Sequence, residues 1–343
     1  MTKYISGLIA LSFCLVACSK SKSAATPNTP PTNLTVTAVA STDSSGNVSI
    51  TAKATNAVTY DIDFGNDTIK TIPSGVVTYK YYQSGTYAIN VVAKSSSGQT
   101  ISASTTVTIA VKLNLIWSDE FNKDGAPDPT KWSYNLGNNN GWGNNELENY
   151  TNDPTNVIVQ NGVLKITAIK GNSNGFAYSS ARLVTENKFA FTYGKVEIRA
   201  MLPSGLGTWP ALWMLGSDYT NPIDAWPACG EIDIMEQIGK NPTTVYGTLH
   251  YPGHSGANGN GATTTVANTS TQFHIYGLQW SPVEIQISVD GVVYQTVQNS
   301  ASIPFNHDFF FIFNVAMGGN FGGTVDPNFV SSTMQVDYIR VYQ

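Results

Sequence analysis

Short runs in which apolar and polar residues alternate recur along most of the chain, and they constrain the fold more than any other feature. Runs of this kind, separated by Gly, Ser and Asn, predict antiparallel strands. Alternating runs lie at residues 47–52, 87–92, 163–168, 194–200 and 285–289, and short apolar runs that are typical of buried strands lie at residues 157–159 and 309–313. Helical periodicity is almost absent. We therefore predict an all-β protein made of two-sheet sandwiches.

The length of 343 residues suggests about two domains. The strand pattern divides in the same way, because residues 34–112 predict a small immunoglobulin-like β-sandwich and residues 115–343 predict a larger one. Within the larger one, Asp290-Gly291 separates two alternating runs, which is a strong β-hairpin signal.

Residues 1–17 are typical of a secretory signal peptide. Lys3 precedes an apolar run that is too short to span a bilayer and that ends at small residues. A buried core helix is the alternative, which an extreme N-terminus disfavours. Residues 15–18, Leu-Val-Ala-Cys, resemble a bacterial lipobox, and this resemblance implies that Cys18 carries lipid and anchors the protein to a membrane.

The position after this cysteine also bears on location. Ser19, in place of Asp, favours the outer membrane, so we expect a secreted lipoprotein of the cell envelope. Residues 18–33 are rich in Ser, Thr, Pro and Lys, which predicts a flexible tether. Since Cys14 leaves with the signal and Cys18 takes lipid, Cys229 stays a free thiol and no disulfide framework is possible.

The small sandwich carries two short motifs. Residues 60–66 and 84–87 resemble those of polycystic-kidney-disease-type modules, with Asn66 where such modules usually have Asp. The resemblance implies a spacer, with carbohydrate binding as the open alternative.

Composition excludes several classes of partner. Charged residues make up 12% of the chain, the net charge is -5, and Lys and Arg form no cluster. Nucleic acids and polyanionic substrates need dense positive charge, so we expect a neutral partner and no nucleic acid. No Gly-rich phosphate loop follows a strand, and the four histidines lack the spacing of metal ligands. We expect no cofactor for catalysis.

Three acids stand close together in an apolar segment: Glu231, Asp233 and Glu236 in Gly-Glu-Ile-Asp-Ile-Met-Glu. On a regular strand the first two share a face, and the third comes one position late. A β-bulge at Ile234-Met235 would return Glu236 to that face. Repulsion and partial burial would then raise the pKa of at least one carboxyl, which supplies a proton donor at neutral pH.

Acids at the two ends of such a row would lie about 5–6 Å apart, the separation that retaining glycosidases use. We therefore predict retention, with Glu231 as nucleophile, Glu236 as general acid/base and Asp233 orienting Glu231. A solvated acidic edge strand or a Ca²⁺ loop is the alternative, which the alternation with Ile232 and Ile234 disfavours.

Residues 226–236 resemble the signature of glycoside hydrolase family 16, laminarinase-like branch. Residues 207–215, 247–251 and 336–342 are similar to the same branch, in the same order, so the resemblance covers about residues 115–343. It implies a concanavalin-like β-jelly roll with a concave cleft. It also implies endo-hydrolysis of β-1,3-glucan or mixed β-1,3/1,4-glucan, and we expect a monomer.

Aromatic rings pack against the C–H groups of sugars, so the resemblance also suggests which residues contact the glucan. The candidates are Trp142, Asn145, Arg182, Trp209, Trp213, Trp226 and His250. Core packing is the alternative for each Trp and for His250. For Trp280, we expect a position in the core. Phe321 stands where the family often has Trp, which leaves one end of the cleft open to question.

Many members of this family hold one Ca²⁺ on the convex face. By the resemblance, the ligands here would be Glu120, the carbonyl of Gly162 and Asp337, all oxygen donors that suit a hard cation. Surface carboxylates without a metal are the alternative.

Other functions stay open at this stage. A jelly roll with aromatic residues could bind surface glycan without cutting it, but the presence of all three acids argues against this. An adhesin predicts neither the acids nor the tryptophans. Within the same fold, a galactan hydrolase or a transglycosylase is the closest alternative, and a sulfated galactan would want more Arg and Lys.

Overall fold

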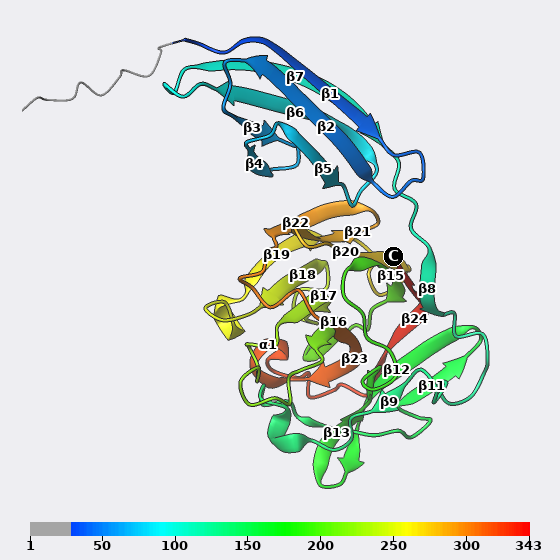
Figure 1. The fold of residues 1–343 in the computed structure, drawn as a ribbon. Helices are drawn as coiled ribbons and strands as arrows, with labels where there is room; N and C mark the ends of the chain where they lie inside the picture. Colours follow the sequence, from blue (N-terminus) through cyan, green and yellow to red (C-terminus); the bar gives the residue numbers. More distant parts are fainter. Residues whose placement is uncertain (1–28) are drawn as a thin grey trace, which may run out of the picture. The chain divides into compact units, whose positions relative to one another are not determined.

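The computed structural model describes residues 29–343, and the fold is almost entirely β (Figure 1). The contacts divide the chain after Lys112 into two compact units. The predicted signal peptide, Cys18 and most of the predicted tether lie outside the described residues. The first strand begins at Thr32, two residues before the predicted start of the small sandwich, so the tether prediction extends too far.

The first unit consists of two antiparallel sheets. One has the order β1-β2-β5 and the other the order β4-β3-β6-β7. Their bounds are β1 Thr32–Ala40, β2 Asn47–Thr55, β3 Thr59–Asp63, β4 Ile69–Ile72, β5 Val76–Lys80, β6 Gly85–Lys94 and β7 Thr100–Ile109. Alternate residues such as Val48 and Ile50 in β2 and Ile89 and Val91 in β6 are fully buried in one shared core. The predicted alternation therefore builds a two-sheet sandwich.

The second unit is a larger pair of sheets. A ten-stranded sheet contains β8 Leu115–Asp119, β10 Glu148–Tyr150, β11 Val157–Gln160, β12 Val163–Ser173, β13 Phe176–Ser180, β15 Gly194–Met201, β20 His274–Trp280, β21 Glu284–Val289, β22 Val292–Gln298 and β24 Ser331–Tyr342. Most neighbours pair antiparallel, while β10 and β13 run parallel. The predicted hairpin is confirmed, since Asp290 and Gly291 join β21 to β22 with φ of 50° and 79°.

The other sheet has seven strands in the order β19-β18-β17-β16-β23-β14-β9. Their bounds are β9 Ser133–Tyr134, β14 Arg182–Val184, β16 Thr208–Gly216, β17 Glu231–Gln237, β18 Thr244–His250, β19 Asn260–Thr265 and β23 Phe309–Met317. Strand β23 lies between β16 and β14 and is buried along its whole length. The sheet carries the three acids of the sequence motif on β17.

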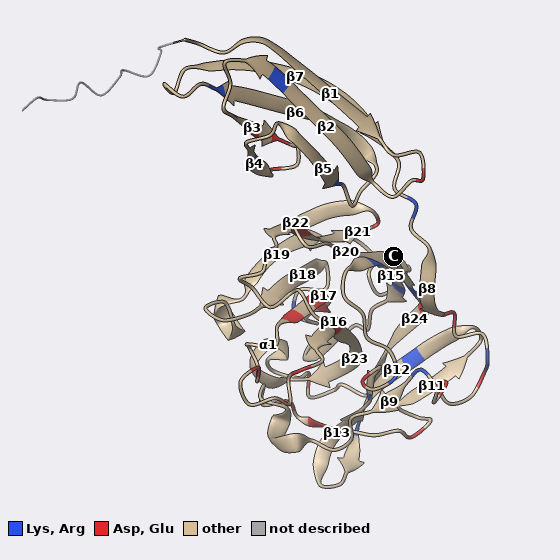
Figure 2. Ribbon diagram, viewed as in Figure 1, with Lys and Arg blue, Asp and Glu red and all other residues tan. Residues whose placement is uncertain are grey.

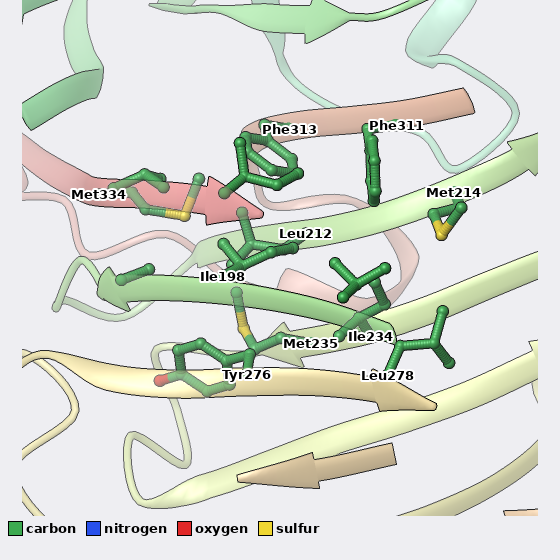
Figure 3. Close-up of a cluster of buried hydrophobic side chains, with 14 of the residues drawn as sticks. Ile198, Leu212, Met214, Ile234, Met235, Tyr276, Leu278, Phe311, Phe313 and Met334 are labelled. Carbon is green, nitrogen blue, oxygen red and sulfur yellow. The ribbon is translucent and has the colours of Figure 1, made fainter. Parts of the chain in front are cut away.

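The inner faces of the two sheets meet in one apolar core. Ile198 of β15 and Leu278 of β20 come from the ten-stranded sheet, and Leu212 of β16, Met235 of β17 and Phe313 of β23 come from the seven-stranded sheet (Figure 3). Trp280 is 1% exposed within this core and donates its indole N–H to the carbonyl of Phe305 at 3.0 Å, which confirms its predicted core position. Burial of apolar side chains from both sheets thus stabilises a jelly-roll-like sandwich.

Charged residues are sparse along both units, and red segments on β17 mark acidic residues (Figure 2). Within residues 29–343, no helix is long and apolar enough to cross a membrane.

Candidate active site

The acidic row lies on the face of β17 that points away from the core. Strand β18 pairs Asp233 with Thr248 and Glu236 with Tyr246, so Ile234 and Met235 together face the single residue between them. This is the predicted β-bulge. Both bulged side chains are fully buried, and the bulge restores Glu236 to the face that carries Glu231 and Asp233.

An indole holds each outer acid. Trp226 donates its Nε1–H to Oε2 of Glu231 at 2.9 Å, and Trp209 donates its Nε1–H to Oε1 of Glu236 at 2.8 Å. The two tryptophans differ in exposure, since Trp226 is 47% exposed and Trp209 only 9%. Trp226 therefore has a ring face to offer a sugar, whereas Trp209 offers little more than its N–H.

His250 lies directly opposite Glu231 in the pairing of β17 with β18. Its Nε2 is 3.2 Å from Oδ2 of Asp233 and 3.8 Å from Oε1 of Glu231. Gly259 packs against the imidazole, and a Cβ at this position would come within 2.6 Å of His250 Cε1. The ring is thus fixed beside the first two acids of the row.

Burial controls the charge of the row. Desolvation raises the pKa of Glu231 well above its usual value, and repulsion by Asp233 adds to this, while His250 and the bond from Trp226 lower it. Desolvation and then Glu236 raise the pKa of Asp233, and its hydrogen bond with Glu231 lowers it. Desolvation also raises the pKa of Glu236, against the bond from Trp209. The row can therefore hold a proton at neutral pH.

Arg182, Trp142 and Trp213 form a second group on the same face. Residues that pair across neighbouring strands share a face, and one such row runs from Arg182 through Asn314 and Ala211 to Glu236. At about 4.8 Å between strands, Arg182 lies about 14 Å from Glu236 along the sheet.

The guanidinium of Arg182 packs against two indoles. Its Cζ lies 4.5 Å from the ring centroid of Trp142 and 4.8 Å from that of Trp213. Its Nε donates to Oδ1 of Asn135 at 3.2 Å. Because Arg182 covers one face of each ring, both indoles are less open to sugar than the sequence prediction assumed.

Four residues behind this group were not anticipated from the sequence. Trp213 Nε1 donates to Asn314 Oδ1 at 2.8 Å, Asn314 Nδ2 donates to the Tyr150 hydroxyl at 3.0 Å, and Tyr150 donates to Glu146 Oε2 at 2.7 Å. Glu148 is fully buried beside Glu146, and desolvation raises its pKa well above the usual value. Asn314 could have been predicted, because it is the one polar residue in the apolar run 309–317.

The remaining predicted contacts lie apart from the acids or have other partners. Asn145 is exposed and donates to Oδ1 of Asn320 at 2.8 Å. Phe321, where a Trp was expected, packs edge-on against Trp209 at 5.6 Å and Tyr246 at 5.0 Å between centroids. It therefore supports the indole that contacts Glu236.

The predicted calcium ligands have cationic partners. Arg340 donates to both oxygens of Glu120, at 2.9 and 2.8 Å, and this bond holds the pKa of Glu120 below its usual value. Asp337 forms an ion pair with Arg199. Gly162 turns the chain between β11 and β12 with φ of 75°. Both carboxylates are thus paired with arginines and not with a cation, and the calcium assignment stays a prediction.

Two family models match the chain. The model of Glycosyl hydrolases family 16 matches residues 144–340, within the second unit, and that of Beta-glucan synthesis-associated protein SKN1/KRE6/Sbg1 matches residues 55–222, which begin in the first unit and end in the second. A beta-glucanase of Rhodothermus marinus is 44% identical over 243 residues, which are 67% of this chain and 85% of that protein.

Two further similarities extend this comparison. Glucan endo-1,3-beta-glucosidase A1 of Niallia circulans is 40% identical over 261 residues, covering 67% of this chain and 38% of that protein. The X-ray structure of the laminarinase from Rhodothermus marinus superposes with a TM-score of 0.65 at 43% identity, covering 68% of this chain and 98% of the laminarinase.

Proposed function

The chain belongs to family 16 of the glycosyl hydrolases, and from this premise we propose that it is an endo-acting, retaining hydrolase of β-1,3-glucan. Relatives named as a β-glucanase, an endo-1,3-β-glucosidase and a laminarinase support the substrate. One observation carries the chemistry: the bulge in β17 puts Glu231, Asp233 and Glu236 in one row, with an indole N–H on each outer acid.

We assign the first step to both outer acids. The carboxylate of Glu231 attacks the anomeric carbon, and the proton of Glu236 goes to the glycosidic oxygen, so the C–O bond breaks and the reducing-end fragment leaves. The product is a glycosyl ester on Glu231. Burial raises the pKa of both outer acids, so the row can hold the one proton that this step takes from Glu236.

The second step reverses the roles. Glu236, now ionised, takes a proton from water as the water oxygen attacks the anomeric carbon, and Glu231 leaves as a carboxylate. Two inversions give net retention. Asp233 shares a hydrogen bond with Glu231 and orients its carboxyl as the ester forms and breaks.

Product analysis tests this assignment directly. The purified protein should release laminarioligosaccharides of β configuration from laminarin early in the reaction, with larger fragments first. Lichenan, carboxymethyl-cellulose and agarose in the same assay define linkage preference. Release of galactose oligomers from agarose, with laminarin left intact, would instead favour a galactan hydrolase.

We also propose the cellular setting from the N-terminal sequence. A lipid on Cys18 would hold the protein in the cell envelope as a monomer, with residues 34–112 as a spacer. Cys18→Ala should move the protein from the membrane fraction to the soluble fraction, and palmitate labelling of this variant would contradict the anchor. A chain of residues 113–343 should keep its activity on soluble laminarin, because the proposed acids and tryptophans all lie there.

A further inference from the structure

Three side chains on neighbouring strands converge on one point of the acidic face. The carboxylates of Glu231 and Asp233 on β17 and the imidazole of His250 on β18 offer ligand atoms that all lie within 4.8 Å of one another. The distances from His250 Nε2, 3.2 Å to Asp233 and 3.8 Å to Glu231, bracket the spacing of about 3.3–3.5 Å between ligands of a tetrahedral Zn²⁺. We propose that these three residues bind a divalent transition metal such as Zn²⁺.

A second observation also points to a ligand. The side chain of Asp233 is only 5% exposed, and within residues 29–343 its Oδ2 takes part in no hydrogen bond, although His250 Nε2 is 3.2 Å away. A buried carboxylate oxygen that accepts no hydrogen bond is costly. A cation placed between Asp233, Glu231 and His250 would satisfy this oxygen.

The ligands are already held in position. Trp226 occupies Oε2 of Glu231, which leaves Oε1 toward His250. Direct pairing of Glu231 with His250 across the two strands fixes their spacing, and Gly259 confines the imidazole from one side. Partners that orient ligands in this way strengthen a metal site, because less order is lost when the ion binds.

The donor set decides which ions fit. One imidazole with two carboxylates suits Zn²⁺ and similar transition metals, whereas Ca²⁺ and Mg²⁺ prefer oxygen ligands alone. Three protein ligands leave a fourth position for water. If Glu231 is the nucleophile, an assignment that rests on the proposed function, the bound ion occupies its free oxygen and blocks attack. The site then makes the enzyme sensitive to transition metals.

Binding can be measured without any glucan. We expect ZnCl₂, at a hundredfold excess over its Kd, to raise the melting temperature of the purified full chain by about 5–10 °C. MgCl₂ at the same concentration should not do so, because Mg²⁺ prefers oxygen ligands alone. His250→Gln should weaken Zn²⁺ binding in calorimetry about tenfold or more, since one of three ligands is lost.

A matched control is available on the same unit. His274 pairs with Asp290 at 2.7 Å, away from the acidic row, so His274→Gln should keep the Zn²⁺ affinity of the wild type. Glu231→Gln provides a second test should His250→Gln not fold. Equal Zn²⁺ affinity in the wild type and in Glu231→Gln or His250→Gln, or equal stabilisation by Mg²⁺, would overturn the proposal.

Activity separates this inference from the proposed function. Zn²⁺ should inhibit laminarin hydrolysis, and EDTA should restore the rate. Cleavage of laminarin without Zn²⁺ binding would refute the metal site alone. Zn²⁺ binding that depends on His250, in a protein that cleaves no β-glucan, would leave the metal site standing and refute the proposed function.

Discussion

The two indoles that contact the outer acids allow the roles of Glu231 and Glu236 to be tested without removing either carboxyl. On the free enzyme, Glu231 must be ionised and Glu236 protonated, so the acidic limb of the kcat/KM profile reports Glu231 and the basic limb reports Glu236. The bonds from Trp226 and Trp209 lower the pKa of their respective acids. Trp226→Phe should therefore move the acidic limb to higher pH, and Trp209→Phe should move the basic limb to higher pH.

The size of the rate effect differs between the two. Glu236 loses its proton in the transition state, so the bond from the nearly buried Trp209, 2.8 Å long, becomes charge-assisted there. Hydrogen bonds to charged groups contribute about 1.5–3 kcal/mol, and Trp209→Phe should lower kcat/KM at its optimum about 10- to 100-fold. Trp226 is half exposed, and its bond stabilises the negative charge of Glu231, which disappears in the attack. Trp226→Phe should therefore lower kcat/KM less than Trp209→Phe does.

The assay is the pH profile of kcat/KM on laminarin for both variants and for Trp213→Phe as control. Trp213 donates to Asn314 and to neither outer acid, so both limbs should stay in place in Trp213→Phe. Melting curves of all three variants check that packing survives. The reasoning is refuted if Trp226→Phe moves the basic limb and Trp209→Phe the acidic limb, which would mean that the two acids exchange roles, or if neither limb moves.

Four further outcomes are expected. With a glycosyl fluoride and azide, Glu231→Ala should yield the α-glycosyl azide and Glu236→Ala the β-glycosyl azide, and proton NMR showing the reverse would exchange the two roles. Arg182→Ala should raise KM for laminarin about tenfold with little change in kcat, since Arg182 orders two indoles away from the acids; a purely catalytic defect would argue against this. Burial raises the pKa of Asp233, so its charge destabilises the fold above that pKa. Asp233→Asn should therefore raise the melting temperature at pH 7 but not at pH 3. A lower melting temperature of this variant at pH 7 would contradict the reasoning. EDTA should lower the melting temperature of the wild type and not of Asp337→Asn, and identical curves for the wild type with and without EDTA would rule against the calcium prediction.

Sequence patterns were sufficient where one physical rule acts over a few residues. Alternation predicted the strands, and the phase of Glu236, one position late after Asp233, required the bulge that β17 contains. Asp290-Gly291 predicted its hairpin because both residues accept positive φ. In each case the determining interaction is local or follows from which side of a strand is buried.

The sequence by itself determined the all-β architecture, the larger sandwich and the acidic row, since periodicity and burial act on consecutive residues. Only the tertiary structure decided which partner each tryptophan contacts and how exposed its ring is. Trp209 donates to Glu236 from a buried position and Trp226 donates to Glu231 from an exposed one, while Arg182 packs against Trp142 and Trp213. The contact of Trp209 joins residues 27 apart, and Arg182 contacts side chains of two other segments, so their geometry depends on how the whole seven-stranded sheet is paired. A tryptophan in the sequence suggests a ring that could contact sugar, but the residues that surround it in the fold determine whether that ring is exposed.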